Sequence, residues 1–163
     1  MEFPTQPPAE IESCEFLWLT QIEELDHNGL RLVLEEGIAN PEATSTTIGN
    51  ITIGDCHRVE KTDSSRIFEV VWKLYVAYSI RNESYTQRDE YDMSNGRQFR
   101  IYSKSRYLDF IGHATFVSDG YPGPIQHIGI GCEDHIVDVV STQGPLITRL
   151  RPERPTSLDA RLN

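Results

Sequence analysis

An alternation of apolar and polar positions between Phe68 and Ile80 is the clearest structural pattern in the chain. Every even position in this stretch is apolar or aromatic: Phe68, Val70, Trp72, Leu74, Val76, Tyr78 and Ile80. Strict period two predicts a β-strand with one buried face. A straight strand of this length would measure about 45 Å, well beyond a usual strand. We therefore expect it to bend, to coil or to cross between two sheets.

A hairpin is predicted near the N-terminus. The dipeptide Asn28-Gly29 is typical of a two-residue type I′ turn, and the strand over 30–34 that follows it alternates leucine with other residues. If these two residues form the loop, Asp26 lies opposite Arg31 in a favourable cross-strand pair. The segment 37–47 is rich in Gly, Pro, Ser and Thr, which predicts a loop.

The remaining pattern is dominated by strands. Runs of β-branched and apolar residues predict strands over 125–132 and 135–141, while helical spacing over 106–117 favours a short helix. The polar stretch 82–96 is long for a loop, which is typical of functional or disordered segments. Hairpin signals prevail over strand–helix–strand alternation. The predicted fold is mainly β, an antiparallel sandwich or barrel of roughly eight strands with one short helix.

The domain organisation follows from length and local composition. A chain of 163 residues fits a single domain. Residues 1–12 are rich in proline and poor in apolar side chains, so a flexible N-terminal lead is expected. The β-rich domain is predicted to span 13–148. The segment 149–163, which holds arginines and prolines, is expected to be a flexible C-terminal tail.

Negative charge is concentrated at the start of the chain. Residues 1–42 hold ten acidic residues and a single base, Arg31, whereas the remaining residues hold 15 acids and 14 bases. The first quarter therefore carries almost all of the net charge of −10. Such a field repels the phosphates of nucleic acids and attracts basic partners. The alternative is that the acidic surface only keeps the protein soluble.

Cysteine usage and the N-terminus suggest a location. Cys14, Cys56 and Cys132 are odd in number and widely spaced, whereas a secreted disulfide framework is even and denser. The N-terminus has neither the basic nor the apolar segment of a secretion signal. No stretch approaches the ~20 apolar residues that cross a bilayer. We expect a cytoplasmic protein that does not contact the membrane.

Few residues are candidates for chemistry. Cys56-His57 together with Cys132 and His135 are zinc-ligand types, but neighbouring strand residues point to opposite faces, which disfavours a shared ion. Cys132 would act as a nucleophile only if His135 or His127 lay within hydrogen-bond reach and Asp134 oriented that base. No catalytic motif surrounds them. We therefore predict no catalytic residue, no metal and no cofactor.

Asp138 is unusual because it interrupts an otherwise apolar strand. It is flanked on both sides by isoleucine and valine within 136–140. A carboxylate in that position either faces solvent or is buried with a partner. We expect Asp138 to face solvent.

The charge distribution favours a protein-binding module, without enzymatic activity, that acts on a basic partner such as a nucleic-acid-binding protein. Inhibitors of this class, among them immunity proteins and the anti-defence proteins of phages, present carboxylates where phosphates would sit. The residues expected to contact the partner are Glu15, Glu23, Glu24, Asp26, Glu35, Glu36, Tyr85 and Tyr91. Direct binding of nucleic acid is not expected.

Two alternatives stay open. One is a small-ligand-binding or hydrolytic β-barrel domain with its site near Cys132, His135 and the segment 82–96. The other is a homodimer formed by pairing of the long strand with a second copy of itself. Metal content and thiol reactivity would distinguish the first alternative from the binding module, and light scattering would address the second.

Overall fold

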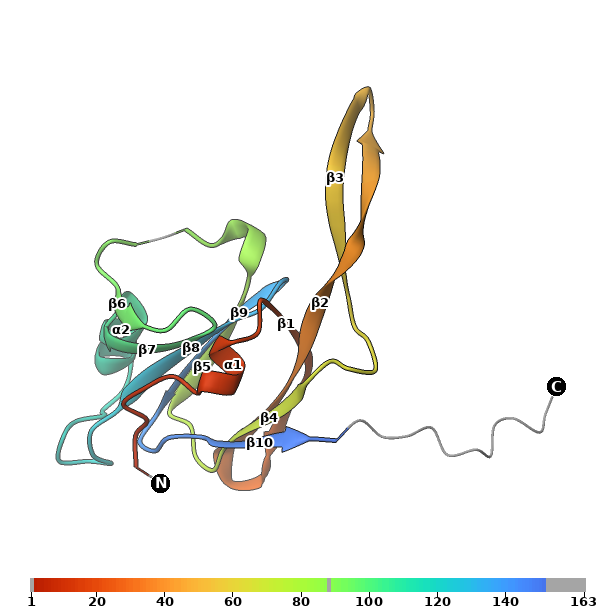
Figure 1. Ribbon diagram of the computed structural model, residues 1–163. Coiled ribbons are helices and arrows are strands. Elements are labelled where there is room, and N and C mark those ends of the chain that lie inside the picture. Colours follow the sequence, from red (N-terminus) through yellow and green to blue (C-terminus); the bar gives the residue numbers. More distant parts are fainter. Residues whose placement is uncertain (1, 88, 152–163) are drawn as a thin grey trace.

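The computed structural model describes residues 2–87 and 89–151, and it has two antiparallel sheets packed face to face (Figure 1). Within the described residues, the first sheet has the order β1 (Phe16–Leu25), β2 (Gly29–Ile48), β4 (Ile67–Trp72) and β10 (Leu146–Leu150), with β3 (Ile51–Glu60) paired to the distal half of β2. The second sheet has the order β5 (Ala77–Asn82), β9 (His135–Ser141), β8 (Gln126–Gly131), β7 (Phe99–Lys104) and β6 (Met93–Asn95). The predicted antiparallel sandwich is confirmed.

Two short helices accompany the sheets. They are α1 (Ala9–Glu12) and α2 (Arg106–Ala114), the second of which confirms the helix predicted within 106–117. Single 3₁₀ turns lie at Asp26–Asn28 and Glu83–Tyr85. None of the helices within the described residues is long and apolar enough to cross a membrane.

The core lies between the two sheets and is built from alternate residues of their strands. Its main members are Leu17, Leu30, Leu32, Leu34, Phe68, Val70, Trp72, Phe99, Ile128, Ile130, Val137 and Val139. The leucines of β2 and the even positions of β4 are thus buried as period-two alternation predicts. Burial of this apolar surface is the main source of stability for such a sandwich.

The long alternating stretch does cross between sheets, as expected. It divides into β4 in the first sheet and β5 in the second, joined by residues 73–76. The crossing is fixed by two hydrogen bonds to β9, because Val76 N donates to Val140 O and Ser141 Oγ donates to Leu74 O. This crossing connects the two layers and carries the chain to the loop that follows β5.

The turn between β1 and β2 differs from the prediction. The loop consists of Asp26–Asn28 rather than of Asn28-Gly29, because Gly29 already belongs to β2. The register therefore places Glu23, and not Asp26, opposite Arg31. The cross-strand ion pair exists, with 3.4 Å between the two charged groups, but the predicted partner was wrong.

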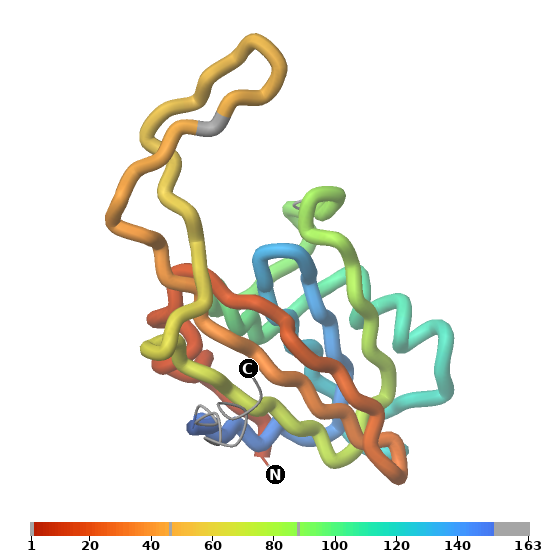
Figure 2. The backbone as a smooth tube through the Cα atoms, turned by 90° about the vertical axis from the view of Figure 1, so that its right-hand side faces the viewer, coloured from red at the N-terminus to blue at the C-terminus, as the bar shows by residue number. Residues whose placement is uncertain are grey.

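The segment 37–47 forms a strand, so the predicted loop is wrong. It is the distal part of β2, which pairs with β3 and projects from the sandwich as a two-stranded ribbon (Figure 2). Threonine and isoleucine in the ribbon favour extended backbone. Proline is accommodated because Pro41 lies where the register shifts between Ala39 and Ala43. We call residues 38–60 the arm.

The folded domain begins before residue 13, earlier than the sequence indicated. Ile11 of α1 is fully buried in the core. The Glu12 carboxylate accepts hydrogen bonds from the backbone N–H groups of Arg97, Gln98 and Phe99, at 2.6–3.0 Å. Three N–H groups aimed at one carboxylate form a strong charge-assisted contact. At the other end, β10 includes residues 149 and 150 of the predicted tail, and residues 152–163 lie outside the described residues.

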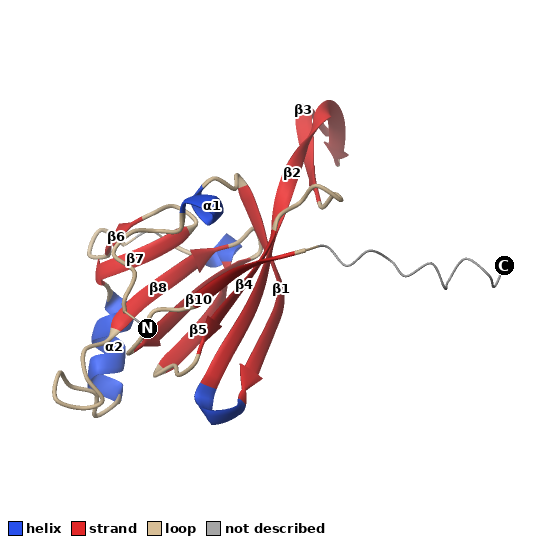
Figure 3. Ribbon diagram, turned by 60° about the horizontal axis from the view of Figure 1, so that its bottom comes forward, coloured by secondary structure: helices blue, strands red, loops and turns tan. Residues whose placement is uncertain are grey.

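Helix α2 covers the outer face of the second sheet (Figure 3). Ser105 is its N-cap, and the Ser105 hydroxyl accepts a hydrogen bond from Leu108 N at 3.0 Å. On β8 and β9, the side chains that do not face the core therefore lie beneath α2 rather than in solvent, and both strands are buried on both faces.

Candidate functional site

A cavity lies between α2, the outer face of the second sheet and the loop that follows β5. Its volume is about 690 Å³. The lining residues are Ser79, Arg81, Gln87, Asp89, Glu90, Asp92, Arg106, Tyr107, Phe110, His127 and Asp138. We call it the α2 cavity. The segment 82–96, predicted from its length to be functional, contributes four of these residues.

The floor of the α2 cavity exists because small residues flank Asp138 in the sheet. Its cross-strand neighbours are Gly129 on β8 and Ser79 on β5. A Cβ atom at Gly129 would lie 3.3 Å from Asp138 Oδ1 and 2.9 Å from the ring of Tyr102. Glycine at position 129 therefore leaves space for the Asp138 carboxylate and the Tyr102 ring to lie side by side.

Asp138 is buried with partners, so the expectation that it faces solvent is wrong. Only about 1% of the residue is exposed. Asp138 Oδ1 lies 3.0 Å from His127 Nε2, and Oδ2 accepts a hydrogen bond from Arg81 at 2.9 Å. Because α2 covers this face of β9, these partners supply the hydrogen bonds that a buried carboxylate needs.

His127 connects this carboxylate to the start of α2. Its Nδ1 lies 2.7 Å from the Ser105 hydroxyl. An ionised carboxylate only accepts hydrogen bonds, so Nε2 carries the hydrogen toward Asp138. The Ser105 hydroxyl accepts from Leu108 N and donates its hydrogen to Nδ1. One chain of hydrogen bonds therefore joins the helix, both central strands and Arg81.

The chain of serine, histidine and aspartate has the connectivity of a hydrolytic triad, but its geometry gives it another role. Ser105 is fully buried and does not line the α2 cavity. Its hydroxyl is engaged both at the helix N-terminus and with His127. A nucleophile must reach substrate. The arrangement instead fixes α2 on the sheet and orients the Arg81 guanidinium at the cavity.

Aromatic rings pack around His127 and form one wall of the site. Tyr102 stacks on the imidazole with ring centroids 4.1 Å apart, and Tyr107 meets it edge-on at 5.3 Å. Burial raises the pKa of both tyrosine hydroxyl groups, so they stay neutral over the physiological range. Phe110 completes the wall at the mouth of the cavity, where 62% of the residue is exposed.

The rim is acidic. Arg106 donates to Asp89 at 2.8 Å, and this hydrogen bond lowers the pKa of the Asp89 carboxyl. Asp92 accepts the backbone N–H of Arg106 at 2.9 Å. Glu90 is exposed and has no hydrogen-bond or ion-pair partner within the described part of the chain. The described lining residues thus include four carboxylates and two guanidinium groups, and each guanidinium is already bound to a carboxylate.

Tyr91 contacts several residues of this rim. The Lys104 ammonium and the Arg106 guanidinium lie over its ring at 3.7 and 4.3 Å. Its hydroxyl donates to Asp109 at 2.5 Å, a contact that raises the pKa of the tyrosine. Tyr85, by contrast, is 88% exposed on the 3₁₀ turn at the start of the loop.

A smaller cavity of about 370 Å³ contains Cys132, which the alternative hypothesis placed at a reactive site. Burial, followed by the charges of Glu133 and Asp134, raises the pKa of this thiol to about 12. Cys132 and His135 share a backbone hydrogen bond but no side-chain contact within the described residues. This arrangement gives no thiolate nucleophile at neutral pH.

The zinc ligand types considered from the sequence do not meet. Cys56-His57 lies on the arm, whereas Cys132 and His135 lie at the end of the second sheet. Across the described ranges, no group of three or more histidine, cysteine or acidic side chains is arranged to hold a metal ion. The three cysteines are unpaired thiols.

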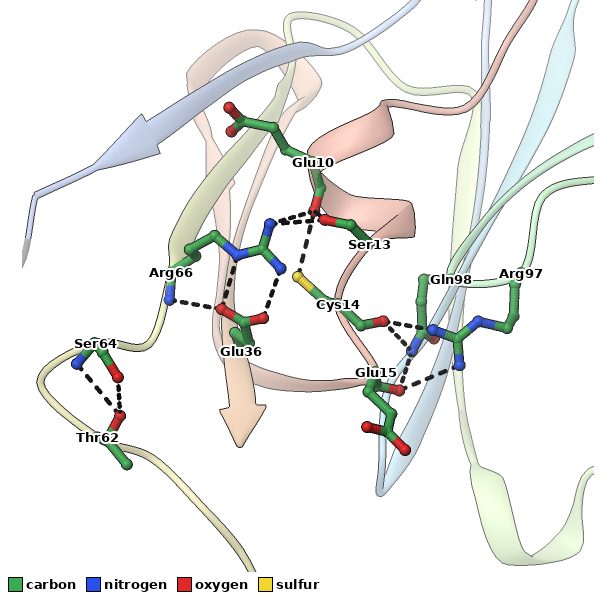
Figure 4. A network of polar contacts seen from close by, with 10 residues as sticks. All are labelled: Glu10, Ser13, Cys14, Glu15, Glu36, Thr62, Ser64, Arg66, Arg97 and Gln98. Atoms are coloured by element: carbon green, nitrogen blue, oxygen red, sulfur yellow. Dashed lines mark hydrogen bonds and ion pairs between the residues drawn. The ribbon is translucent and has the colours of Figure 1, made fainter. Parts of the chain in front are cut away.

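Of the six early carboxylates expected to contact the partner, Glu35 and Glu36 are partly buried and form ion pairs with Lys61 and Arg66. Figure 4 shows Glu36 accepting three hydrogen bonds from Arg66, two from the guanidinium at 2.6 and 2.8 Å and one from the backbone N–H at 3.2 Å. The Arg66 guanidinium also donates to Ser13 of the N-terminal segment. The hydrogen bond from Arg66 lowers the pKa of Glu36. Glu35 lies 3.1 Å from the Lys61 ammonium.

The other four stay exposed and lie toward different ends of β1. Glu15 precedes the strand and lines the smaller cavity, whereas Asp26 lies in the turn at its far end. Glu23 pairs loosely with Arg31, and Glu24 accepts a hydrogen bond of 2.7 Å from the Tyr78 hydroxyl. The chain thus separates carboxylates that are close in sequence.

The cavity residues were missed because they come from a charge-balanced part of the sequence. Only the length of the segment 82–96 and the isolated carboxylate among valines pointed toward them. No family model, curated protein or solved structure matches the chain.

Proposed function

We propose that this protein is a non-enzymatic binding module that captures a basic protein partner and receives a basic side chain of that partner in the α2 cavity. The observation that carries the proposal is the pairing inside the cavity. Among the described lining residues, Arg81 and Arg106 are each bound to a carboxylate, so the side chains of Glu90 and Asp92 have no guanidinium partner there. An incoming cation offsets these negative charges.

The aromatic walls of the cavity also suit a cationic side chain. Tyr107 and Phe110 present ring faces and edges at the cavity, and the apolar stem of lysine or arginine packs on such rings while its charged end reaches a carboxylate. Aromatic side chains beside charged rims are typical of the residues that dominate binding energy at protein interfaces.

The exposed carboxylates outside the cavity have a secondary role in this proposal. Glu15, Glu23, Glu24 and Asp26 add to a field that speeds the encounter with a basic partner, and Tyr85 lies beside the cavity loop as an exposed contact. Glu35 and Glu36 contribute less, because their charges are compensated by Lys61 and Arg66.

An inhibitory or immunity role against a nucleic-acid-binding protein fits this chemistry, since carboxylates then take the place of phosphates. The protein would act in the cytoplasm, where its three thiols stay reduced. Membrane contact and direct nucleic-acid binding have no part in the proposal.

Binding of a fluorescent oligoarginine peptide tests the proposal. We expect Glu90→Gln in the cavity to weaken binding by roughly fivefold. Glu42→Gln on the arm, which makes the same change of net charge, should leave binding nearly unchanged. Phe110→Ala should weaken binding, whereas Phe116→Ala, at a similarly exposed ring, should not. Equal effects of the cavity and control variants would reduce the interaction to net charge and contradict the proposal.

A second candidate function is binding of a small cationic ligand at the same place. The volume of the α2 cavity favours it, because pockets for small molecules measure about 300–1,000 Å³. The two functions differ in how affinity should depend on the length of the arginine ligand. A protein partner predicts that affinity rises from a single arginine amide to the oligoarginine peptide, whereas a small-ligand site predicts that the amide binds as well as the peptide.

A further inference from the structure

The arm is an element that the proposed function does not use. Its strands pair with each other from Ile38 and Glu60 to the turn at Gly49 and Asn50. Contacts of β2 with the rest of the first sheet stop before the arm begins, at Gly37 on the β1 side. Over the described residues, the arm therefore leaves the sandwich as an isolated ribbon with both edges open (Figures 1 and 2).

The two faces of the distal arm differ. Cross-strand partners share a face, and Ile48 pairs with Ile51, while Ile53 follows on the same face two residues later. The three isoleucines are 67%, 67% and 48% exposed. On the opposite face, the hydroxyl groups of Thr47 and Thr52 lie 3.1 Å apart. One face thus carries the three isoleucines, and the other carries the paired threonine hydroxyl groups.

The distal arm also contains no charge. Residues 43–54 include no Asp, Glu, Lys or Arg, in a chain of which a quarter is charged. Natural sheets protect open edges with charged residues, prolines or bulges. Here Pro41 and the charged Glu42 and Asp55 flank the uncharged segment, and the register shift within it lies between Thr44 and Thr46, before the isoleucines of the tip. Depletion of charge together with exposed apolar side chains is typical of an interface core.

We infer that the arm is a self-association element, and that the isoleucine faces of two arms pack together in a two-fold dimer. In a two-fold contact the same patch meets itself, so like charges would face like charges unless the patch is uncharged. The segment 43–54 meets that condition, and it would not attract the basic partner that suits the carboxylates at the α2 cavity. A second copy is therefore the occupant that the chemistry of the arm fits best.

The length of the arm makes such a dimer compatible with the charge of the protein. Each copy carries a net charge of −10, which opposes close approach of two sandwiches. An extended ribbon of this length holds the tip roughly 30 Å from its base. Screening in physiological salt acts over about 8 Å, so two bodies joined at their tips scarcely repel each other.

The dimer would also stabilise the ribbon. An isolated two-stranded hairpin is marginally stable in water, and neither face of the distal arm is covered by the rest of the chain within the described residues. Packing of two isoleucine faces removes this apolar surface from water.

Sedimentation velocity over a range of protein concentrations tests the inference. We expect a monomer–dimer equilibrium that weakens about tenfold or more in the double variant Ile51→Thr, Ile53→Thr, which keeps β-branched side chains in the ribbon. The matched control, Ile22→Thr with Leu146→Thr, changes two exposed apolar residues of the sandwich and should leave the equilibrium unchanged. A monomer at every concentration, or a dimer that only the control variant weakens, would overturn the inference.

A distance measurement between copies tests the geometry directly. A nitroxide attached to Asn50→Cys, in a Cys56→Ser background, places one label at each tip. Strong dipolar coupling between the labels of two copies is expected. Dimerisation without coupling would mean that each arm docks elsewhere on its partner, which contradicts tip-to-tip packing. Neither readout involves the oligoarginine peptide, so failure here leaves the proposed function of the α2 cavity standing.

Discussion

His127 Nε2 lies 3.0 Å from Asp138 Oδ1 beneath helix α2, and both side chains are almost completely buried. The pair links the two central strands of the second sheet, and Ser105 extends the link to the helix. Arg81 joins from the solvent side, where about half of its side chain is exposed. The floor of the α2 cavity is therefore a buried polar network that joins α2 to the second sheet.

Loss of the Asp138 carboxylate should destabilise the fold. Asp138→Ala leaves His127 and Arg81 without their acceptor in a buried site, and breaking a buried pair in this way costs about 3 kcal/mol. Urea unfolding measures the change. Asp134→Ala, an exposed carboxylate near the start of the same strand, should change the free energy of unfolding by no more than about 0.5 kcal/mol. Equal effects of the two variants would show that the network does not hold the helix on the sheet.

The ion pair between Glu36 and Arg66 should make stability depend on pH in the acid range. The hydrogen bond from Arg66 lowers the pKa of Glu36 in the folded protein below its ordinary value of 4.5. The pair therefore contributes fully above that ordinary value, and its contribution is lost as the pH falls through the lowered folded pKa.

Comparison with Glu36→Gln isolates this contribution. At neutral pH we expect the variant to be less stable than the native protein by about 2 kcal/mol, measured by urea unfolding. The difference should shrink as the pH falls below 4.5. A difference that stays constant from neutral pH to strongly acidic solution would exclude the ion pair as its cause.

The three thiols should differ in their reactivity. Burial raises the pKa of Cys14 to about 11 and that of Cys132 to about 12, so both remain protonated and covered at mildly alkaline pH. Cys56 lies on the arm and is partly exposed. Alkylation of the native protein followed by mass spectrometry should modify Cys56 alone. Equally fast modification of Cys132 would return it to consideration as a reactive residue.

The periodic parts of the sequence predicted the sandwich well. Alternation in the stretch from Phe68 to Ile80 identified the buried face of β4 and the need to cross between sheets, because period two depends only on the local backbone and one apolar layer. β-Branched runs located β8 and β9 for the same reason.

Features that depend on tertiary contacts were not predictable in this way. The segment 37–47 has the composition of a loop, yet pairing with β3 makes it a strand. Residues 9–12 look like a flexible lead, yet Ile11 is buried in the core and Glu12 accepts hydrogen bonds from the N–H groups of residues 97–99, at the start of β7. Composition describes one segment, whereas pairing requires its partner.

The candidate site could not be predicted either, because it also depends on tertiary contacts. The net charge of the first 42 residues drew attention to the N-terminus, but Lys61 and Arg66 compensate Glu35 and Glu36 in the fold. The acidic rim of the α2 cavity comes from the segment 82–96, which lies outside the acidic N-terminal quarter and forms a rim only because α2 lies beside it. Asp138 is likewise buried because α2 covers it, and the sequence of its own strand gives no sign of that contact.

Nuclear magnetic resonance titration with arginine amide tests the central claim, that the α2 cavity takes a basic group, most directly. We predict saturable shifts of the ring signals of Tyr107 and Phe110, unchanged signals from Phe116, and loss of the shifts in Glu90→Gln. A neutral analogue, norvaline amide acetylated at its amine, should produce none of these shifts. If the cavity rings do not respond to arginine amide, or respond equally to the neutral analogue, the claim is contradicted.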